Sequence, residues 1–148
     1  MKARDLMTEN PEFVTPDDPI TRAAQIMRDI NVGIVPVVDN PDSRKLQGVI
    51  TDRDIAVRHV AEGHAQECRV RDEMTSGRLD TVRPDTEDRE IFELMKRDQI
   101  RRIPVVDENN RLLGIVAQAD LATRLGRKEP EQVEELVEKV SEPGRPQR

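Results

Sequence analysis

Aromatic residues are nearly absent from this chain of 148 residues, which has two phenylalanines and neither tyrosine nor tryptophan. Proteins that bind single-stranded nucleic acid commonly stack bases on aromatic side chains, so this class of function is disfavoured. An excess of basic residues is also missing, because the formal net charge is −6. DNA, RNA and anionic membranes are therefore not expected as general partners, since their binding needs a basic surface.

Cysteine and long apolar runs are scarce as well. Cys68 is the only cysteine, so no internal disulfide can form. No apolar run approaches the roughly 18 residues of a membrane-spanning helix, and no secretory hydrophobic segment follows Met1. We therefore predict a cytoplasmic protein. Hydrophobic residues make up 35% of the chain and are grouped in short dense runs, which indicates a folded protein with a charged surface.

An internal repeat shows how the chain is organised. An Arg-Asp-x-Met-Thr segment at residues 4–8 returns at 71–75, and a Pro-Val-Val-Asp segment at 36–39 returns at 104–107. The spacing between the copies changes only within polar loops, which indicates duplication of one folded unit. We expect units at residues 1–64 and 65–126. Residues 127–148 are predicted to form a helix at 129–140 and a disordered end.

Each unit is predicted to run strand, helix, strand, strand, helix. In the first unit Asp18 is expected to cap a helix that begins at Pro19. One apolar face of this helix is predicted to be formed by Ile20, Ala23, Ala24, Met27 and Ile30. The other predicted elements are strands at 13–14, 34–38 and 46–50 and a helix at 52–60, then strands at 79–82, 103–106 and 112–116 and helices at 88–98 and 118–125.

The most informative stretch is Gly48-Val49-Ile50-Thr51-Asp52-Arg53-Asp54, where an apolar strand is predicted to end and a charged helix to begin. A helix N-terminus offers unpaired N–H groups and a partial positive charge to a phosphate. Thr51 adds a hydroxyl, and the Asp54 carboxylate can accept both hydroxyls of a ribose. A second copy runs from Gly114 to Asp120, with Ala117 in the place of the threonine.

In combination, these repeated motifs resemble a tandem pair of CBS domains, the module named after cystathionine beta-synthase. The resemblance covers nearly everything from Lys2 to Arg124. It implies an α/β (α+β) fold in which two βαββα units pack about a pseudo-two-fold axis, with two ligand clefts. It also implies frequent homodimers and a regulatory role as a sensor of adenosine derivatives such as AMP, ADP, ATP or S-adenosylmethionine, with no cofactor of its own.

The resemblance assigns nucleotide contacts to particular residues of this chain. Thr51 and Asp54 fill the hydroxyl and ribose-binding positions of the first unit, and Asp120 fills the carboxylate position of the second. Arg101 and Arg102 stand where basic residues of the family contact phosphate. The first unit has Gly33 and Ile34 there, so the basic pair is one-sided, and Ala117 removes one hydrogen bond from the second site.

Each assignment has a plainer alternative. Thr51 and Asp54 are also typical helix-capping residues, and Arg101 and Arg102 are also typical of a solvated surface. Arg53 is expected to be exposed. Met27 and Met95 are both expected to belong to the core. For the whole chain, the alternative to a nucleotide sensor is a protein-interaction scaffold with vestigial clefts, which binds an unidentified protein target.

Catalysis has no candidate residues, because no nucleophile and base stand together in a recognisable motif and no phosphate-binding glycine loop is present. His59 and His64 are five residues apart across a predicted helix end. A structural zinc site needs about four ligands, so both histidines are expected at the surface and no metal is predicted. Cys68 is expected to be a linker residue. A metal or redox protein that uses these three residues is the third and weakest hypothesis.

Overall fold

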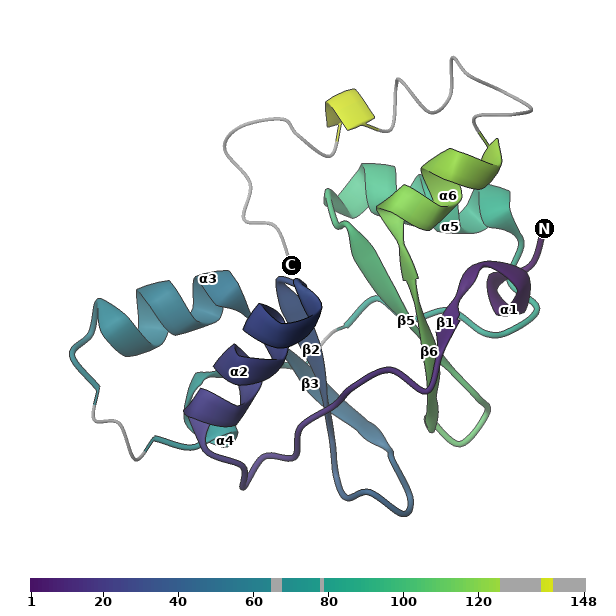
Figure 1. Ribbon diagram of the computed structural model, residues 1–148. Coiled ribbons are helices and arrows are strands. Elements are labelled where there is room, and N and C mark those ends of the chain that lie inside the picture. The colour runs from purple at the N-terminus through teal and green to yellow at the C-terminus, as the bar shows by residue number, and fades with distance from the viewer. Residues whose placement is uncertain (65–67, 78, 126–136, 140–148) are drawn as a thin grey trace. The chain divides into compact units, whose positions relative to one another are not determined.

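A computed structural model describes residues 1–64, 68–77, 79–125 and 137–139. The chain folds into two compact units, each with its own three-stranded antiparallel sheet. The β3 unit comprises residues 12–79 and 109–112, and the β6 unit comprises residues 1–11, 80–108 and 113–148. Each is named after the central strand of its sheet (Figure 1). Helices and strands are mixed in both units, which confirms the predicted α/β class.

The β3 unit is built on a hairpin that the sequence predicts closely. Strand β2 (Ile34–Val38) pairs antiparallel with β3 (Leu46–Thr51), and the short strand β4 (Thr75–Ser76) pairs with the other edge of β3. The helices of this unit are α2 (Ile20–Ile30), α3 (Asp52–Asp54), the π-helix η1 (Ile55–Val60) and α4 (Val70–Glu73). A helix was predicted over 52–60, but its π-helical turn was not.

The β6 unit repeats this arrangement with other parts of the chain. Its central strand β6 (Leu112–Ala117) pairs with β5 (Arg102–Val106) on one edge and with β1 (Thr8–Glu9) on the other. Its helices are α1 (Ala3–Leu6), α5 (Asp88–Asp98) and α6 (Gln118–Leu125). The bounds of α5 and α6 agree with those predicted from the sequence.

The opening segment of each sequence repeat pairs with the sheet of the other repeat. Residues 1–11 belong to the β6 unit, and residues 69–77, which open the second repeat, belong to the β3 unit. The compact units thus differ from the consecutive division at 64 and 65 that the sequence predicts. The physical reason is that β1 and β4 find their hydrogen-bonding edges on β6 and β3, far along the chain.

The repeated glycines make room for these exchanged strands. A Cβ atom added to Gly48 would lie 2.4 Å from the carbonyl oxygen of Thr75, and one added to Gly114 would lie 2.7 Å from that of Thr8. Real Cβ atoms essentially never approach a backbone oxygen this closely. Each glycine is therefore required by the close approach of the Met-Thr segment from the other repeat.

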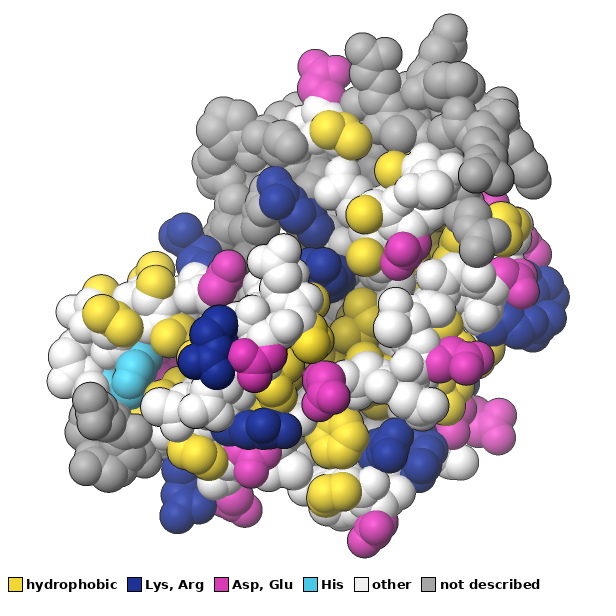
Figure 2. All heavy atoms as spheres, viewed as in Figure 1, with side chains coloured by type: hydrophobic (Ala, Val, Ile, Leu, Met, Phe, Trp, Pro, Cys, Tyr) yellow, Lys and Arg dark blue, Asp and Glu magenta, His cyan; other side chains and the backbone are white. Residues whose placement is uncertain are grey.

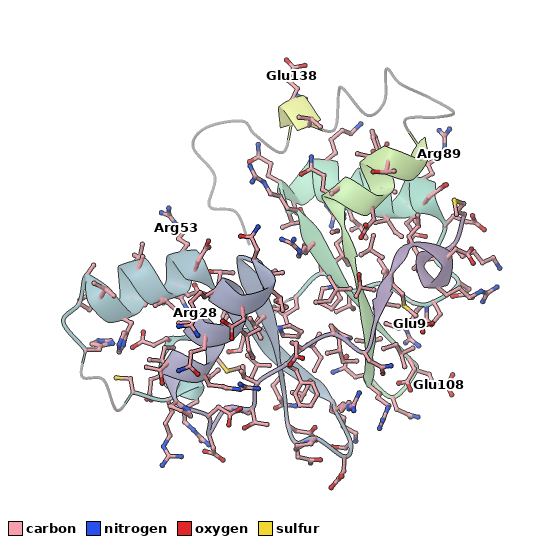
Figure 3. All side chains as sticks on the ribbon, viewed as in Figure 1. Glu9, Arg28, Arg53, Arg89, Glu108 and Glu138 are labelled. Atoms are coloured by element: carbon pink, nitrogen blue, oxygen red, sulfur yellow. The ribbon has the colours of Figure 1, made fainter. Side chains whose placement is uncertain are left out.

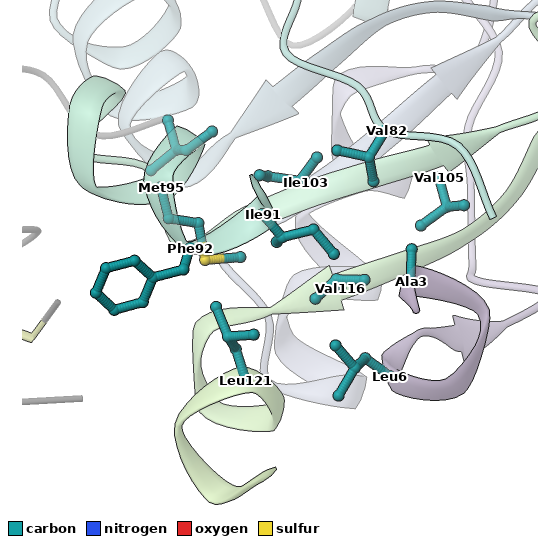
Figure 4. Close-up of a cluster of buried hydrophobic side chains, with 11 residues drawn as sticks. Ala3, Leu6, Val82, Ile91, Phe92, Met95, Ile103, Val105, Val116 and Leu121 are labelled. Carbon is teal, nitrogen blue, oxygen red and sulfur yellow. The ribbon is translucent and has the colours of Figure 1, made fainter. Parts of the chain in front are cut away.

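Each unit has its own hydrophobic core. In the β6 unit Met95 and Phe92 from α5 pack with Leu121 from α6 and with the inner face of the sheet (Figure 4). Met95 is fully buried, and Met27 packs against the core of the β3 unit, so both methionines are core residues as predicted. Ala24 and Ile30 were wrongly assigned to the buried face of α2, because both are exposed, and Ile26 is buried there instead.

Other local predictions were also wrong. Asp18 does not cap α2, because its carboxylate accepts a hydrogen bond from the Thr15 N–H instead, and Pro19 is the N-cap residue. The strands predicted at 13–14 and 79–82 reduce to single bridges, Val14 to Val37 and Val82 to Val105.

The predicted tail helix at 129–140 lies outside the described residues except for 137–139, which are helical, and the end predicted to be disordered also lies outside them. None of the helices in the described ranges has the length and apolar character needed to cross a membrane.

Candidate functional site

The strand-to-helix junction of the β3 unit is closed by a reciprocal pair of hydrogen bonds. Thr51 ends β3 and is the N-cap of α3, and its Oγ1 accepts a hydrogen bond from the Asp54 N–H at 3.0 Å. In return the Thr51 N–H donates to Oδ2 of Asp54, also at 3.0 Å. This is a capping box, which pairs two backbone donors that would otherwise be unsatisfied at a buried helix end. Both side chains are buried.

The Asp54 carboxylate has further partners within its unit. The hydroxyl of Thr75, on β4, donates to this carboxylate and lies 3.2 Å from each of its oxygens. Arg58 places its Nε 3.8 Å from Oδ1, but the arginine side chain is half exposed, so solvent screens this attraction. A ribose that binds Asp54 would have to share or replace these contacts. The capping alternative is thus realised at this junction, and nucleotide contact by Thr51 and Asp54 stays a prediction.

At the corresponding junction of the β6 unit, the described residues form no such box. Ala117 ends β6 and offers no hydroxyl, and the Asp120 carboxylate is partly exposed and accepts no hydrogen bond from any residue in the described part of the chain. Both junctions share one backbone contact. The Asp52 N–H donates to the Gly33 carbonyl at 2.9 Å, and the Gln118 N–H donates to the Arg101 carbonyl at 2.7 Å.

This shared contact locates the basic pair. Arg101 directly precedes β5 and is exposed, and Arg102 is the first residue of β5 and is half buried. The Arg101 carbonyl accepts a hydrogen bond from the first N–H of α6. The start of β5, with both arginines, therefore lies beside the N-terminus of the helix that carries Asp120. The structure thus brings three of the predicted residues to one end of one unit, and it places Thr51 and Asp54 in the other unit.

Two further sequence predictions have different outcomes. Arg53 is exposed on α3, and its side chain points away from its unit (Figure 3), as predicted. His59 was predicted to lie at the surface, and this is wrong, because its side chain is only 11% exposed. It belongs to a cluster with His64, Cys68 and Glu73, in which one ligand atom of each residue lies within 4.8 Å of the others.

Sequence reasoning missed Glu73 in this cluster because nothing in its local pattern separates it from a surface glutamate. It also missed Thr75 as a partner of Asp54. In both cases the missing information is the pairing of β4 with β3. This pairing places Thr75 beside Asp54 and packs α4, which ends at Glu73, against η1. The repeated Met-Thr opening was the one signal that pointed to a structural role for this segment.

A family model for the CBS domain matches residues 3–59 and 70–127. The chain belongs to the CBS domain family. A relative in Bacillus subtilis, the CBS domain-containing protein YhcV, is 42% identical over 119 residues, which cover 80% of this chain and 81% of that protein. Hypoxic response protein 1 of Mycobacterium tuberculosis is 34% identical over 123 residues, which cover 83% of this chain and 84% of that protein.

Solved structures of CBS proteins share the fold. The crystal structure of hypoxic response protein I, with two coordinated zinc ions, has a TM-score of 0.74, is 33% identical, and is matched over 84% of this chain and 99% of that one. CBSX2 in complex with AMP has a TM-score of 0.72 at 26% identity, over 85% of this chain and 96% of that one. The CBS domain pair of MJ0100, with 5′-methylthioadenosine and S-adenosyl-L-methionine, has a TM-score of 0.75 at 28% identity, over 87% and 98%. The fold of this chain is that of a tandem CBS pair.

Proposed function

We propose that this CBS pair is a non-enzymatic regulatory module that binds an adenosine-derived nucleotide through Thr51, Asp54, Asp120, Arg101 and Arg102. The relatives that hold AMP or S-adenosyl-L-methionine support the ligand class. The observation that carries the proposal is the hydrogen bond between the Gln118 N–H and the Arg101 carbonyl. It joins a basic pair, a helix N-terminus and the Asp120 carboxylate, which accepts no hydrogen bond from the described residues, at one end of the β6 unit.

These groups match two different parts of a nucleotide, the phosphates and the ribose. The guanidinium groups of Arg101 and Arg102 match the geometry of phosphate oxygens and carry a permanent positive charge. The first N–H groups of α6 add a partial positive charge at its N-terminus. The Asp120 carboxylate accepts from donors such as the two hydroxyls of a ribose. With only two aromatic residues in the chain, the base would pack against aliphatic side chains.

The hydrogen bonding of the two junctions favours Asp120 as the more available carboxylate. The sequence favours Asp54, because its motif retains the threonine. However, the Asp54 carboxylate already accepts hydrogen bonds from two donors, the Thr51 N–H and the Thr75 hydroxyl, whereas that of Asp120 accepts none from the described residues. A ligand at Asp54 must exchange existing hydrogen bonds, so its net gain is smaller. We therefore propose that the Asp120 junction contributes more binding energy.

Regulation would follow from linkage. A nucleotide that binds one conformation of the module more tightly than another shifts the population toward that conformation, by no more than its difference in affinity. The response would then be a change in shape or assembly that a partner detects.

Calorimetric titration of the purified chain with AMP, ADP, ATP and S-adenosylmethionine tests this proposal. We expect saturable binding of at least one ligand. Loss of a charged hydrogen bond in Asp120→Asn should weaken it by about 10–150-fold. Asp85→Asn, at an exposed position of the same unit, is the matched control and should bind like the wild type. The absence of binding to all four ligands at millimolar concentration would contradict the proposal.

The basic pair has its own test. Arg101→Ala and Arg102→Ala should weaken the binding of ATP more than the binding of adenosine, because only ATP carries the phosphates that these side chains would contact. Arg53→Ala removes one exposed arginine from the other unit and serves as the control. Equal losses for ATP and adenosine would assign the arginines a structural role.

We also propose that the module forms a homodimer. Val57 and Val60 of η1 support this, because their apolar side chains are 47% and 68% exposed. Light scattering should give twice the chain mass for the wild type and the chain mass for Val60→Lys. A wild-type monomer would contradict the dimer. Co-purification of another protein with no nucleotide would favour the scaffold alternative.

A further inference from the structure

Four side chains of metal-ligating types meet at the end of η1 in the β3 unit. His59 lies on η1, His64 follows its last turn, Cys68 precedes α4, and Glu73 is the last residue of α4. One ligand atom from each lies within 4.8 Å of the others. Figure 2 shows histidine atoms, in cyan, at the surface of this region. Such a set of imidazole, thiol and carboxylate groups is far more selective than a cluster of acidic residues.

The π-helical turn brings the two histidines together. Its hydrogen bonds run from the N–H of Ala61 to the carbonyl of Ala56 and from the N–H of His64 to the carbonyl of His59, each five residues apart. Residues five apart therefore lie one above the other instead of on diverging faces. The imidazole ring centroids are 6.1 Å apart. Such wide turns in helices occur frequently at functional sites.

The buried carboxylate of Glu73 is incompletely satisfied. Its side chain is only 1% exposed. Oε1 contacts Nδ1 of His64 and lies 3.5 Å from Nδ1 of His59. Oε2 of Glu73 and Nδ1 of His59 are both buried without a hydrogen-bond partner among the described residues. A His64–Glu73 ion pair alone leaves these two atoms unexplained, and burial of such groups is costly. A bound cation would engage both.

We propose that His59, His64, Cys68 and Glu73 bind one Zn²⁺ ion. A sulfur, two nitrogens and one carboxylate oxygen are donors that Zn²⁺ prefers, whereas Mg²⁺ and Ca²⁺ require oxygen ligands. A thiolate and a carboxylate neutralise the charge of the ion. Zinc–ligand bonds of about 2.0–2.3 Å place tetrahedral donor atoms roughly 3.3–3.8 Å apart, so side-chain adjustments on the order of 1 Å complete the site.

The ion would hold together two segments that also support Asp54. Asp54 immediately precedes η1, at whose far end His59 lies, and Glu73 is two residues before Thr75, whose hydroxyl donates to Asp54. Arg58 already links the segments through hydrogen bonds to the carbonyls of Glu73 and Met74. With four protein ligands and no open position, the ion is structural and fixes η1 against α4. This inference does not depend on nucleotide binding.

The test uses the full chain, stripped with a chelator and titrated with Zn²⁺ against a chromophoric competitor, with bound metal measured by mass spectrometry. We expect one zinc per chain and a higher melting temperature with zinc. Glu73→Gln, His64→Asn and Cys68→Ser should each lower the zinc affinity by more than about 100-fold. Mutation of groups that merely orient metal ligands already lowers metal affinity by about 10–100-fold. Glu62→Gln removes an equal charge from an exposed neighbouring position and should leave zinc binding unchanged.

Co²⁺ in place of zinc gives a readout of the thiolate. The wild type should show a sulfur-to-cobalt charge-transfer band and the intense visible bands of a tetrahedral ion, and Cys68→Ser should lose the former. Failure of the wild type to retain zinc against the competitor would overturn the site. So would retention by the three variants at the level of Glu62→Gln. If Glu73→Gln does not fold, the two more exposed ligands, His64 and Cys68, still decide the question.

Discussion

Replacing Asp54 by alanine should destabilise the protein, and replacing Asp120 by alanine should not. Asp54 is buried and accepts hydrogen bonds from the Thr51 N–H and the Thr75 hydroxyl. Its removal leaves a buried N–H unpaired, at a cost of about 1–3 kcal/mol, and opens a capping box that contributes about 0.5–2 kcal/mol. We expect a loss of about 2–4 kcal/mol, since the two effects overlap.

For Asp120 the same reasoning gives a different result. Its partly exposed carboxylate accepts no hydrogen bond from the described residues, so Asp120→Ala should stay within about 0.5 kcal/mol of the wild type. In a chain of this size each kcal/mol changes the melting temperature by about 2–4 °C. Asp54→Ala should therefore melt roughly 5–15 °C lower, and Asp120→Ala within about 2 °C.

Thermal unfolding followed by circular dichroism, without nucleotide, measures both shifts. Asp54→Asn is an informative third variant, because its amide oxygen can still accept from the Thr51 N–H while the charge is lost. It should fall between the wild type and Asp54→Ala. Equal melting temperatures for Asp54→Ala and Asp120→Ala would refute the argument, since they would mean that the capping box contributes nothing to stability.

Four other substitutions test the packing of the two units and the turn between β2 and β3. Gly48→Ala should destabilise by about 1–3 kcal/mol in chemical denaturation, and more than Gly114→Ala, because its new methyl group would lie closest to a backbone carbonyl; equal effects would contradict this. Met95→Ala should cost about 2–5 kcal/mol, because the side chain is fully buried, and a shift below 1 kcal/mol would place it outside the core. The hydrogen bond from the Ser43 hydroxyl, with backbone N–H groups, holds the pKa of Asp39 below its usual range. This contribution to stability is present above the unfolded-state pKa and is lost as pH falls through the lower folded-state pKa. Ser43→Ala should raise the Asp39 pKa in an NMR titration, and an unchanged value would exclude the hydroxyl as the cause.

The regular elements were predictable to within a residue or two where an apolar run ends at a turn signal. The hairpin of β2 and β3 and the helices α5 and α6 are examples. Such signals are local, because they depend on alternation or helical spacing within about ten residues. Predictions failed where a local pattern had two solutions. Asp18 could cap a helix or satisfy the Thr15 N–H, and the backbone of the following turn selected the second.

The candidate nucleotide residues show the same division. Their types and order were evident from the repeat, and so was the one-sided basic pair. Which junction is better prepared for a ligand was not evident, because the sequence contains no sign that Thr75 would reach Asp54 from another strand. The meeting of His59, His64 and Cys68 with Glu73 was missed for an equivalent reason. Glu73 joins the histidines only through tertiary packing.

The sequence by itself determined the duplication, the α/β class, the paired junctions and the membership of Met95 in the core. These depend on residue spacing, which the chain carries locally. Only the tertiary structure decided that each repeat supplies a strand to the other's sheet and that His59 is buried beside Glu73. It also decided that the Asp54 carboxylate accepts hydrogen bonds from the described residues while that of Asp120 does not. These facts depend on hydrogen bonds and contacts between segments that are distant in the chain. They also depend on a π-helical turn that the residue pattern did not predict.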